Sequence, residues 1–331
     1  MGAMLQRGGG LRALWLVLLG LAASPSAVSA ATGLVYVSHE RSDNIVMLNK
    51  EDEVVGQIKT CARPRGMTRT PDRKSLIVAC GNDDTIAVYD LASRTLIKRF
   101  RDVPDPETFD LHPNGRDLYI SNEDDSECSV LNLETGEITA HYATGPEPEG
   151  VLATPDGKRV FVASEAGNLV HVIDVPSGKV VKDIVVGTRP RRFALSLDGK
   201  ELWVSCEIAG IVDVIDTATL QSKGQISFLP KGMRREQVTP VDLVMTRDGK
   251  TAYVALGRAN HVAVVDVASR AVKDYILVGR RPWGMRFSTD EKTLYVANGL
   301  SDDLSIVDLA SGKVRKTVPV GMVPYGIIVD D

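Results

Sequence analysis

The stretch VVGTRPRRFALSLDGKELWVSCE, residues 185–207, joins an Arg-Pro-Arg-Arg cluster to an Asp-Gly turn and then to an aromatic–β-branched pair, Trp203-Val204. Glycine supplies the positive φ that tight hairpins need, so Asp198-Gly199 marks a turn between two short strands. A closely similar pattern occurs six more times in the chain. The stretch is therefore one copy of a repeat, and the repeat decides the fold.

The seven copies can be aligned on the large residue that precedes a Val, Ile or similar partner. These positions are Tyr36, Ile77, Tyr119, Phe161, Trp203, Tyr253 and Tyr295. They are 41, 42, 42, 42, 50 and 42 residues apart. A fixed period of this length is typical of propellers and other repeat architectures. The fifth unit carries about eight extra residues, which fall in residues 227–243.

Each unit has hydrophobic residues at alternate positions and is divided by turn residues into four short strands. The last strand of a unit follows a Pro, as in RRFALS (residues 191–196), and an Asp-Gly or Asn-Gly turn leads from it into the next unit. We predict an all-β fold, a seven-bladed β-propeller of four-stranded antiparallel blades. GIIV (residues 326–329) lacks a following strand and LVYV (residues 34–37) lacks a preceding one, so we expect them to pair and close the ring.

The N-terminus has the order of a secretory signal: Arg7 and Arg12, then the apolar run ALWLVLLGLAA (residues 13–23), then small residues ending at Ala30. The run is short for a transmembrane helix, which needs roughly 20 residues. We predict a cleaved signal peptide over residues 1–30 and a single propeller domain over residues 31–331, exported to the periplasm without a membrane anchor. An uncleaved N-terminal anchor is the alternative.

The charge balance argues against a nucleic-acid partner. The chain has 39 basic and 43 acidic residues, a formal net charge of −4, and loss of Arg7 and Arg12 would make it more negative. Nucleic-acid-binding domains usually carry a basic patch and a net positive charge. The chain also lacks Cys-x-x-Cys-His, Gly-x-Ser-x-Gly and Walker motifs. We therefore expect no nucleic-acid partner and no cofactor of its own.

The segments YVAN, HVIDV, SGKV, VVGTRP and TPDGK resemble the YVTN β-propeller repeat over essentially the whole mature chain. The stretches PDPETFDLHPNGRDLYISNEDD (residues 104–125) and VALGRANHVAVVD (residues 254–266) are similar to exported propellers associated with PQQ-dependent catabolism. This resemblance implies an association with periplasmic PQQ-linked alcohol oxidation, and it does not imply a reaction.

Strand alternation brings two sets of variable residues to one face of the disc, around a central mouth. Convergent polar groups in a concavity form a ligand site, and Arg suits ligands that carry a carboxylate. The alternative is that these charges only pair with one another, and that the two aromatic residues only fill the hole. The candidate ligand-binding residues are Arg65, Glu107, Glu149, Arg191, Trp283, Tyr325, His39, Glu123, Glu165, Glu207, Arg234 and Arg235.

Arg234 and Arg235 belong to the long fifth connection, which also contains Lys231. We expect this basic loop to fold over the mouth, opposite its carboxylates. The mature chain has four cysteines, and Cys61 and Cys80, which flank one predicted hairpin, are the best candidates for a disulfide. Cys128 and Cys206 are expected to stay free. The sequence shows no calcium loop or His-x-x-x-His pair, so we assign no metal ligand and no catalytic residue.

These features favour a non-enzymatic binding or scaffold protein over an enzyme. Its expected partner is a small acidic ligand or a periplasmic PQQ-dependent dehydrogenase. The alternative function is that of a propeller enzyme, a lactonase-like hydrolase, or a subunit of a periplasmic dehydrogenase. A metal-dependent hydrolase would need at least three oxygen or nitrogen ligands that converge on the axis within bonding distance. The arrangement around Glu123, Glu165, Glu207 and Asn298 therefore discriminates between these alternatives.

Overall fold

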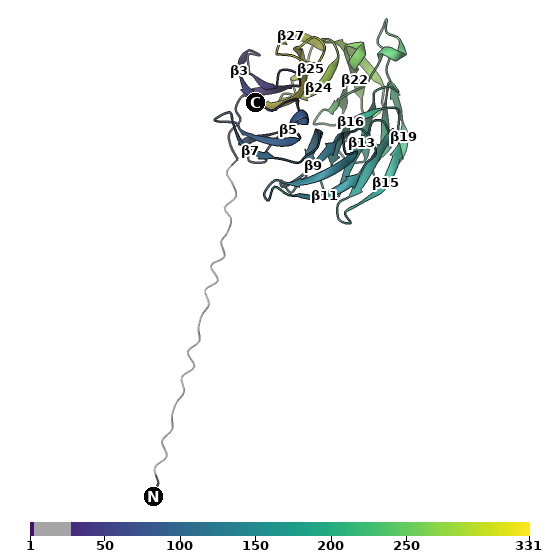
Figure 1. Ribbon diagram of the computed structural model, residues 1–331. Coiled ribbons are helices and arrows are strands. Elements are labelled where there is room, and N and C mark those ends of the chain that lie inside the picture. The colour runs from purple at the N-terminus through teal and green to yellow at the C-terminus, as the bar shows by residue number, and fades with distance from the viewer. Residues whose placement is uncertain (3–27) are drawn as a thin grey trace.

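The structure is a computed structural model that describes residues 1–2 and 28–331. The predicted signal peptide falls almost wholly on residues 3–27, which lie outside the described residues. The described chain forms seven four-stranded antiparallel sheets set around a common axis (Figure 1). The predicted seven-bladed β-propeller is confirmed. Within residues 28–331 there is no helix long and apolar enough to cross a membrane.

Each blade has four strands, numbered outward from the axis. The first strands contact one another in a closed series around the ring. They are β28 (Pro324–Asp330), β4 (Pro64–Arg69), β8 (Pro106–Leu111), β12 (Pro148–Ala153), β16 (Pro190–Leu195), β20 (Leu243–Met245) and β24 (Pro282–Phe287). We number the blades 1 to 7 in this order. The second strands are β1 (Leu34–His39), β5 (Ser75–Cys80), β9 (Asp117–Asn122), β13 (Arg159–Ser164), β17 (Glu201–Cys206), β21 (Thr251–Ala255) and β25 (Thr293–Asn298).

The two outer strands of each blade complete the sheets. The third strands are β2 (Asn44–Leu48), β6 (Thr85–Asp90), β10 (Glu127–Asn132), β14 (Leu169–Asp174), β18 (Ile211–Asp216), β22 (His261–Asp266) and β26 (Asp303–Asp308). The outermost strands are β3 (Val54–Lys59), β7 (Thr95–Phe100), β11 (Ile138–Ala143), β15 (Lys179–Val185), β19 (Gln221–Ser227), β23 (Val272–Leu277) and β27 (Lys313–Pro319). Three short 3-10 turns, η1 (Gly81–Asp83), η2 (Arg235–Gln237) and η3 (Gly257–Ala259), lie in connections.

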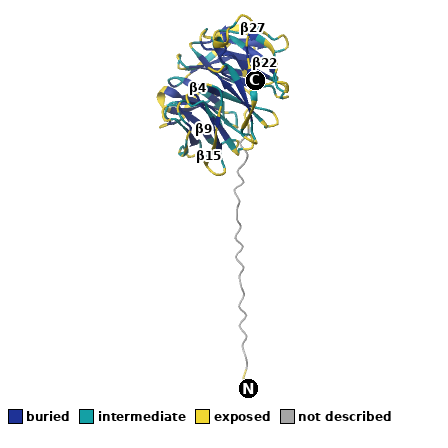
Figure 2. Cartoon of the chain, turned by 90° about the vertical axis from the view of Figure 1, so that its right-hand side faces the viewer, coloured by how far each residue is buried: buried dark blue, intermediate teal, exposed yellow. Residues whose placement is uncertain are grey.

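The hydrophobic core lies between the blades. Seven clusters of buried side chains each join two neighbouring sheets around the ring. The large residue on which the repeats were aligned lies on the second strand of its blade and is buried in every copy, with Trp203, Tyr36 and Phe161 fully buried. Figure 2 shows the buried strands inside the disc and the exposed turns at its surface. Burial of such a side chain stabilises the fold by about 1.5–3 kcal/mol, so the repeat period reflects the packing between blades.

The ring is closed within blade 1 by strands from the two ends of the chain. Strand β28 pairs antiparallel with β1, with Tyr36 opposite Ile328 and Val37 opposite Ile327, as the sequence predicts. The fully buried carboxylate of Asp330 accepts hydrogen bonds from the backbone N–H and the hydroxyl of Thr32, at 2.8 and 2.7 Å. Arg69 and Arg73 pair with the same carboxylate. Closure is therefore held by charge as well as by strand pairing.

The strand register fixes which residues share a face. The Pro that opens a first strand lies opposite the last residue of the second strand, as for Pro148 and Ser164 or Pro282 and Asn298. The start of the first strand and the turn after the second strand therefore lie on the same side of the disc. We call this side the mouth face.

A disulfide joins Cys61, just before blade 2, to Cys80 at the end of β5. Cys128 and Cys206 are buried and free.

Candidate functional site

Buried charges fill the centre of the mouth face, and they come from the residue after the Pro in successive blades. On one side, Arg65 pairs with Glu107, and its Nε lies 3.0 Å from a carboxylate oxygen of Glu40. Glu107 also receives Arg63 at 2.5 Å. The side chain of Glu107 is fully buried and that of Arg65 is 7% exposed. Buried charges of this kind are stable only when they are paired, and here each has a partner.

On the other side of the mouth, Arg191 pairs with Glu165 and lies 3.5 Å from both Glu149 and Glu207. Arg189 also pairs with two of these carboxylates, Glu165 at 2.8 Å and Glu207 at 3.2 Å. These interactions link two neighbouring blades, 4 and 5.

Two aromatic side chains complete the site. The Tyr325 hydroxyl donates to Glu149 at 2.6 Å and accepts from Arg65 at 3.0 Å. Two guanidinium groups lie over the Trp283 ring, that of Arg191 at 4.8 Å and that of Arg281 at 4.7 Å from its centre. Such cation–π contacts favour ordered stacking. Trp283, with carboxylates and guanidinium groups, lines a pocket of about 230 Å³ at the mouth.

The environment separates the pKa values of two carboxylates that share Arg191. Burial acts to raise the pKa of Glu149, but the guanidinium groups of Arg191 and Arg192 outweigh it and hold that pKa far below its usual range. Burial and the neighbouring Glu149 carboxylate raise the pKa of Glu165 to about 8. Pairs whose pKa values are pushed apart are typical of acid–base sites.

The structure brings most of the predicted site residues together. Arg65, Glu107, Glu149, Arg191, Trp283, Tyr325, Glu123, Glu165 and Glu207 all belong to the mouth network or line its pocket. The charged groups are extensively paired with one another. Such pairing is the alternative to ligand binding that the sequence left open.

Three predicted residues lie elsewhere. His39 is fully buried at the end of β1 and packs against Gly321 instead of lining the mouth pocket. Arg234 and Arg235 lie on the long loop, whose buried Phe228 and Val238 pack into the core between blades 5 and 6. Turn η2 of this loop contacts η3 of blade 6. The loop is therefore anchored to blade 6, and neither arginine lines the mouth pocket.

Three further arginines of the site were not predicted from the sequence: Arg63, Arg189 and Arg281, each of which directly precedes a Pro. All three have positive φ, 53°, 62° and 60°, a conformation that is uncommon for residues other than Gly. A side-chain oxygen from the preceding blade, such as that of Asp43 or Asn168, holds the N–H of this residue at 3.0 Å. The sequence feature that could have identified these arginines is the dipeptide Arg-Pro, which occurs at this position in three repeats.

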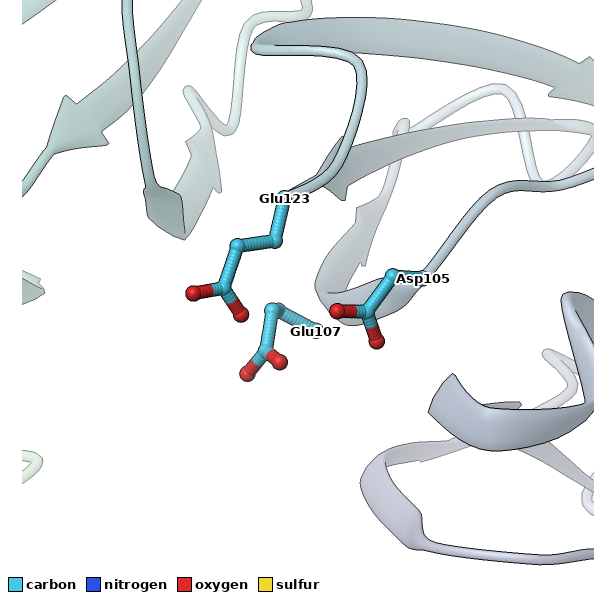
Figure 3. Close-up of side chains that lie close together, drawn as sticks. All are labelled: Asp105, Glu107 and Glu123. Atoms are coloured by element: carbon cyan, nitrogen blue, oxygen red, sulfur yellow. The ribbon is translucent and has the colours of Figure 1, made fainter.

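One group of carboxylates has the spacing of a metal site. Asp105, Glu107 and Glu123 point toward one another, with ligand atoms within 4.8 Å (Figure 3). Arg63 lies among them, at 2.7, 2.5 and 3.9 Å from the three residues. Since Arg63 lies among these carboxylates and Arg65 also pairs with Glu107, we assign no metal to them.

Comparison with known proteins agrees with the fold. The family model described as a lactonase with a seven-bladed β-propeller matches residues 178–330, less than half of the chain. No curated protein matches the chain at a significant level.

Solved structures are similar over most of the chain. Hydrazine synthase from Kuenenia stuttgartiensis has a TM-score of 0.76 at 18% identity, covering 89% of this chain and 99% of that one. The periplasmic gluconolactonase of Pseudomonas aeruginosa has a TM-score of 0.74 at 21% identity, covering 89% and 98%. A putative 6-phosphogluconolactonase from Bacteroides uniformis has a TM-score of 0.73 at 15% identity, with the same coverage. At these identities the likeness concerns the fold, and it identifies the chain as a seven-bladed β-propeller protein.

Proposed function

We propose that the protein is a lactonase-like hydrolase whose reaction takes place at the mouth. The observation that carries the proposal is the pair Glu149 and Glu165, which share Arg191 but have opposite pKa shifts. The partial match to the lactonase family model and the lactonases among the structural neighbours support the same reaction class.

In this proposal Glu165 acts as the general base. Its carboxylate takes a proton from a water molecule, whose oxygen attacks the carbonyl carbon of the lactone. The ring C–O bond then breaks, and the proton passes from Glu165 to the departing ring oxygen, which gives a hydroxy acid. A positioned carboxyl group contributes about 10²–10⁴-fold to such reactions.

Arg189 is placed to stabilise the negative charge that develops on the carbonyl oxygen. Its side chain is 40% exposed at the mouth, and Nε and Nη2 make its two ion pairs. Arginine has five N–H donors, so donors on Nη1 remain for a ligand. Trp283 supplies a flat surface for the ring, while Glu149 stays ionised and keeps Arg191 in place.

The test uses glucono-1,5-lactone with the purified protein, and acid release is followed above the spontaneous rate. We expect Glu165→Gln to lower kcat/KM at least about 100-fold. For the wild type we expect kcat/KM to rise with pH through about 8, since the basic form is the active one. Glu134→Gln removes an exposed carboxylate from the opposite face and serves as the matched control.

A wild type that gives no rate above the spontaneous one with 1,4- and 1,5-lactones of sugar acids contradicts hydrolysis. A Glu165→Gln variant with full activity removes Glu165 from the mechanism.

Export to the periplasm, the YVTN-type repeat and the association with PQQ-dependent oxidation remain predictions from the sequence. A scaffold for a periplasmic dehydrogenase would place a partner on the mouth face, and no contact described above favours it over hydrolysis.

A further inference from the structure

A second pocket lies on the mouth face, where blades 6 and 7 meet. It has a volume of about 340 Å³ and is lined by Arg258, Asn260, Arg280, Arg281 and Leu300. Three of these five residues are arginines, and none is acidic. The pocket is separate from the mouth pocket, which has a different set of lining residues.

Hydrogen bonds to side-chain oxygens hold the backbone of all three arginines. Arg258 is the middle residue of η3, and its N–H donates to Thr239 Oγ1 at 2.8 Å. The N–H of Arg280 donates to Ser301 Oγ at 2.8 Å, and that of Arg281 to Asn260 Oδ1 at 3.0 Å. Their backbones are thus fixed before any ligand arrives.

The arginines differ in how far they are neutralised. Arg281 pairs with Glu207 at 2.6 Å and stacks on Trp283. Arg258 and Arg280 are exposed, and neither forms an ion pair with any residue in the described part of the chain. Elsewhere on this face the arginines of the mouth are matched by buried carboxylates, so this pocket holds an excess of positive charge.

At two other junctions an acidic residue takes the place of Asn260. The junction between blades 1 and 2 also has two arginines at the matching positions, Arg41 and Arg63, but there Asp43 takes the place of Asn260 and holds the Arg63 N–H. At the junction between blades 7 and 1 the same place is taken by Asp302. The fold needs only an oxygen acceptor at this position, and Asn260 provides it without a negative charge.

We propose that Arg258, Arg280 and Arg281 form an oxyanion-binding site for the phosphate or carboxylate group of a small ligand. Guanidinium groups bind both through paired N–H donors. Arg281 connects the site to Trp283, so the rest of the ligand lies toward the mouth. Binding here goes beyond the proposed hydrolysis and does not require it.

The experiment is isothermal titration of the purified protein with inorganic phosphate and, separately, with gluconate at low salt. The test variant is R258Q/R280Q, which leaves Arg281 and the mouth network intact. The matched control is K158Q/K200Q, which removes two positive charges from exposed turns on the opposite face. Thermal unfolding checks that both variants are folded.

We expect R258Q/R280Q to weaken binding at least tenfold, while K158Q/K200Q stays within twofold of the wild type. Higher salt should weaken wild-type binding, since exposed charges are screened. Binding of phosphate alone or gluconate alone supports the site and identifies the group that it prefers. Failure of the wild type to bind either anion overturns the proposal, as does equal binding by both variants. Neither result depends on lactone turnover.

Discussion

His39 is a titratable side chain in a place that cannot accommodate its charge. It is fully buried, and neither ring nitrogen has a hydrogen-bond partner among the described residues. Burial lowers the pKa of His39 to about 4, whereas an unfolded histidine titrates near 6.5. Between these values the unfolded chain binds a proton that the folded chain excludes. The free energy of unfolding is therefore not reduced by His39 above pH 6.5, and it falls as the pH is lowered from 6.5 to 4.

We expect this single residue to cost the wild type roughly 3 kcal/mol of unfolding free energy between pH 7 and pH 4. Urea unfolding of wild type and His39→Gln at several pH values measures the difference between them, which cancels the effect of other groups. His39→Leu serves as a second variant, since it also binds no proton. A difference that does not change with pH would show that His39 is protonated without penalty.

At the same scale, the sequence predicted the charged residues after each Pro but not those before it. Residues at alternate positions of a strand follow from its period, so Arg65, Glu149 and Arg191 could be assigned to the mouth. Arg63, Arg189 and Arg281 stand outside the strands in a left-handed conformation. No alternation pattern extends to such a position, and only the contact with the preceding blade fixes where the side chain points.

At the scale of elements, the disulfide between Cys61 and Cys80 fastens the connection before blade 2 to the end of β5. The bridge spans 19 residues, for which the chain-entropy model gives about 3 kcal/mol of stabilisation. We expect C61A/C80A to lose stability of this order in urea unfolding. Reductant should lower the free energy of unfolding of the wild type to about that of the variant, and it should leave the variant's free energy of unfolding unchanged. Equal responses of the two proteins would contradict a formed bridge.

The four strands of each blade could be predicted because the same pattern recurs seven times, and each copy supports the others. The long connection in residues 227–243 has no second copy. Its basic residues suggested a position over the mouth, whereas its apolar residues Phe228 and Val238 hold it in the core beside blade 6. Burial of apolar surface outweighs the attraction between exposed charges, which contributes no more than about 1 kcal/mol per pair.

At the scale of the whole molecule, stability depends on closing the ring. Removal of residues 322–331 takes away β28 and the buried carboxylate of Asp330, which leaves β1 unpaired on one side and Arg69 without its partner. We expect the shortened protein to be insoluble or to melt at least about 10 °C lower. Removal of Asp331 alone is the control, because that residue lies beyond β28. A normal melting temperature for the shortened protein would contradict closure by these strands.

Closure could be predicted from the sequence because each end of the chain carries the strand that the other lacks. The position of Asp330 among two arginines and Thr32 could not, since these contacts join residues that only the completed ring brings together.

The pairing of β1 with β28 also sets an order of events during synthesis. Thr32 and Asp330 are 298 residues apart, so at about 5–20 residues per second the first strand waits roughly 15–60 s for its partner to be made. During that time β1 lacks the strand that covers its inner edge, and an unpaired strand edge is a template for pairing with other chains. In a chain that is still being synthesised, the inner edge of β1 therefore has no native partner until residues 324–330 have been made.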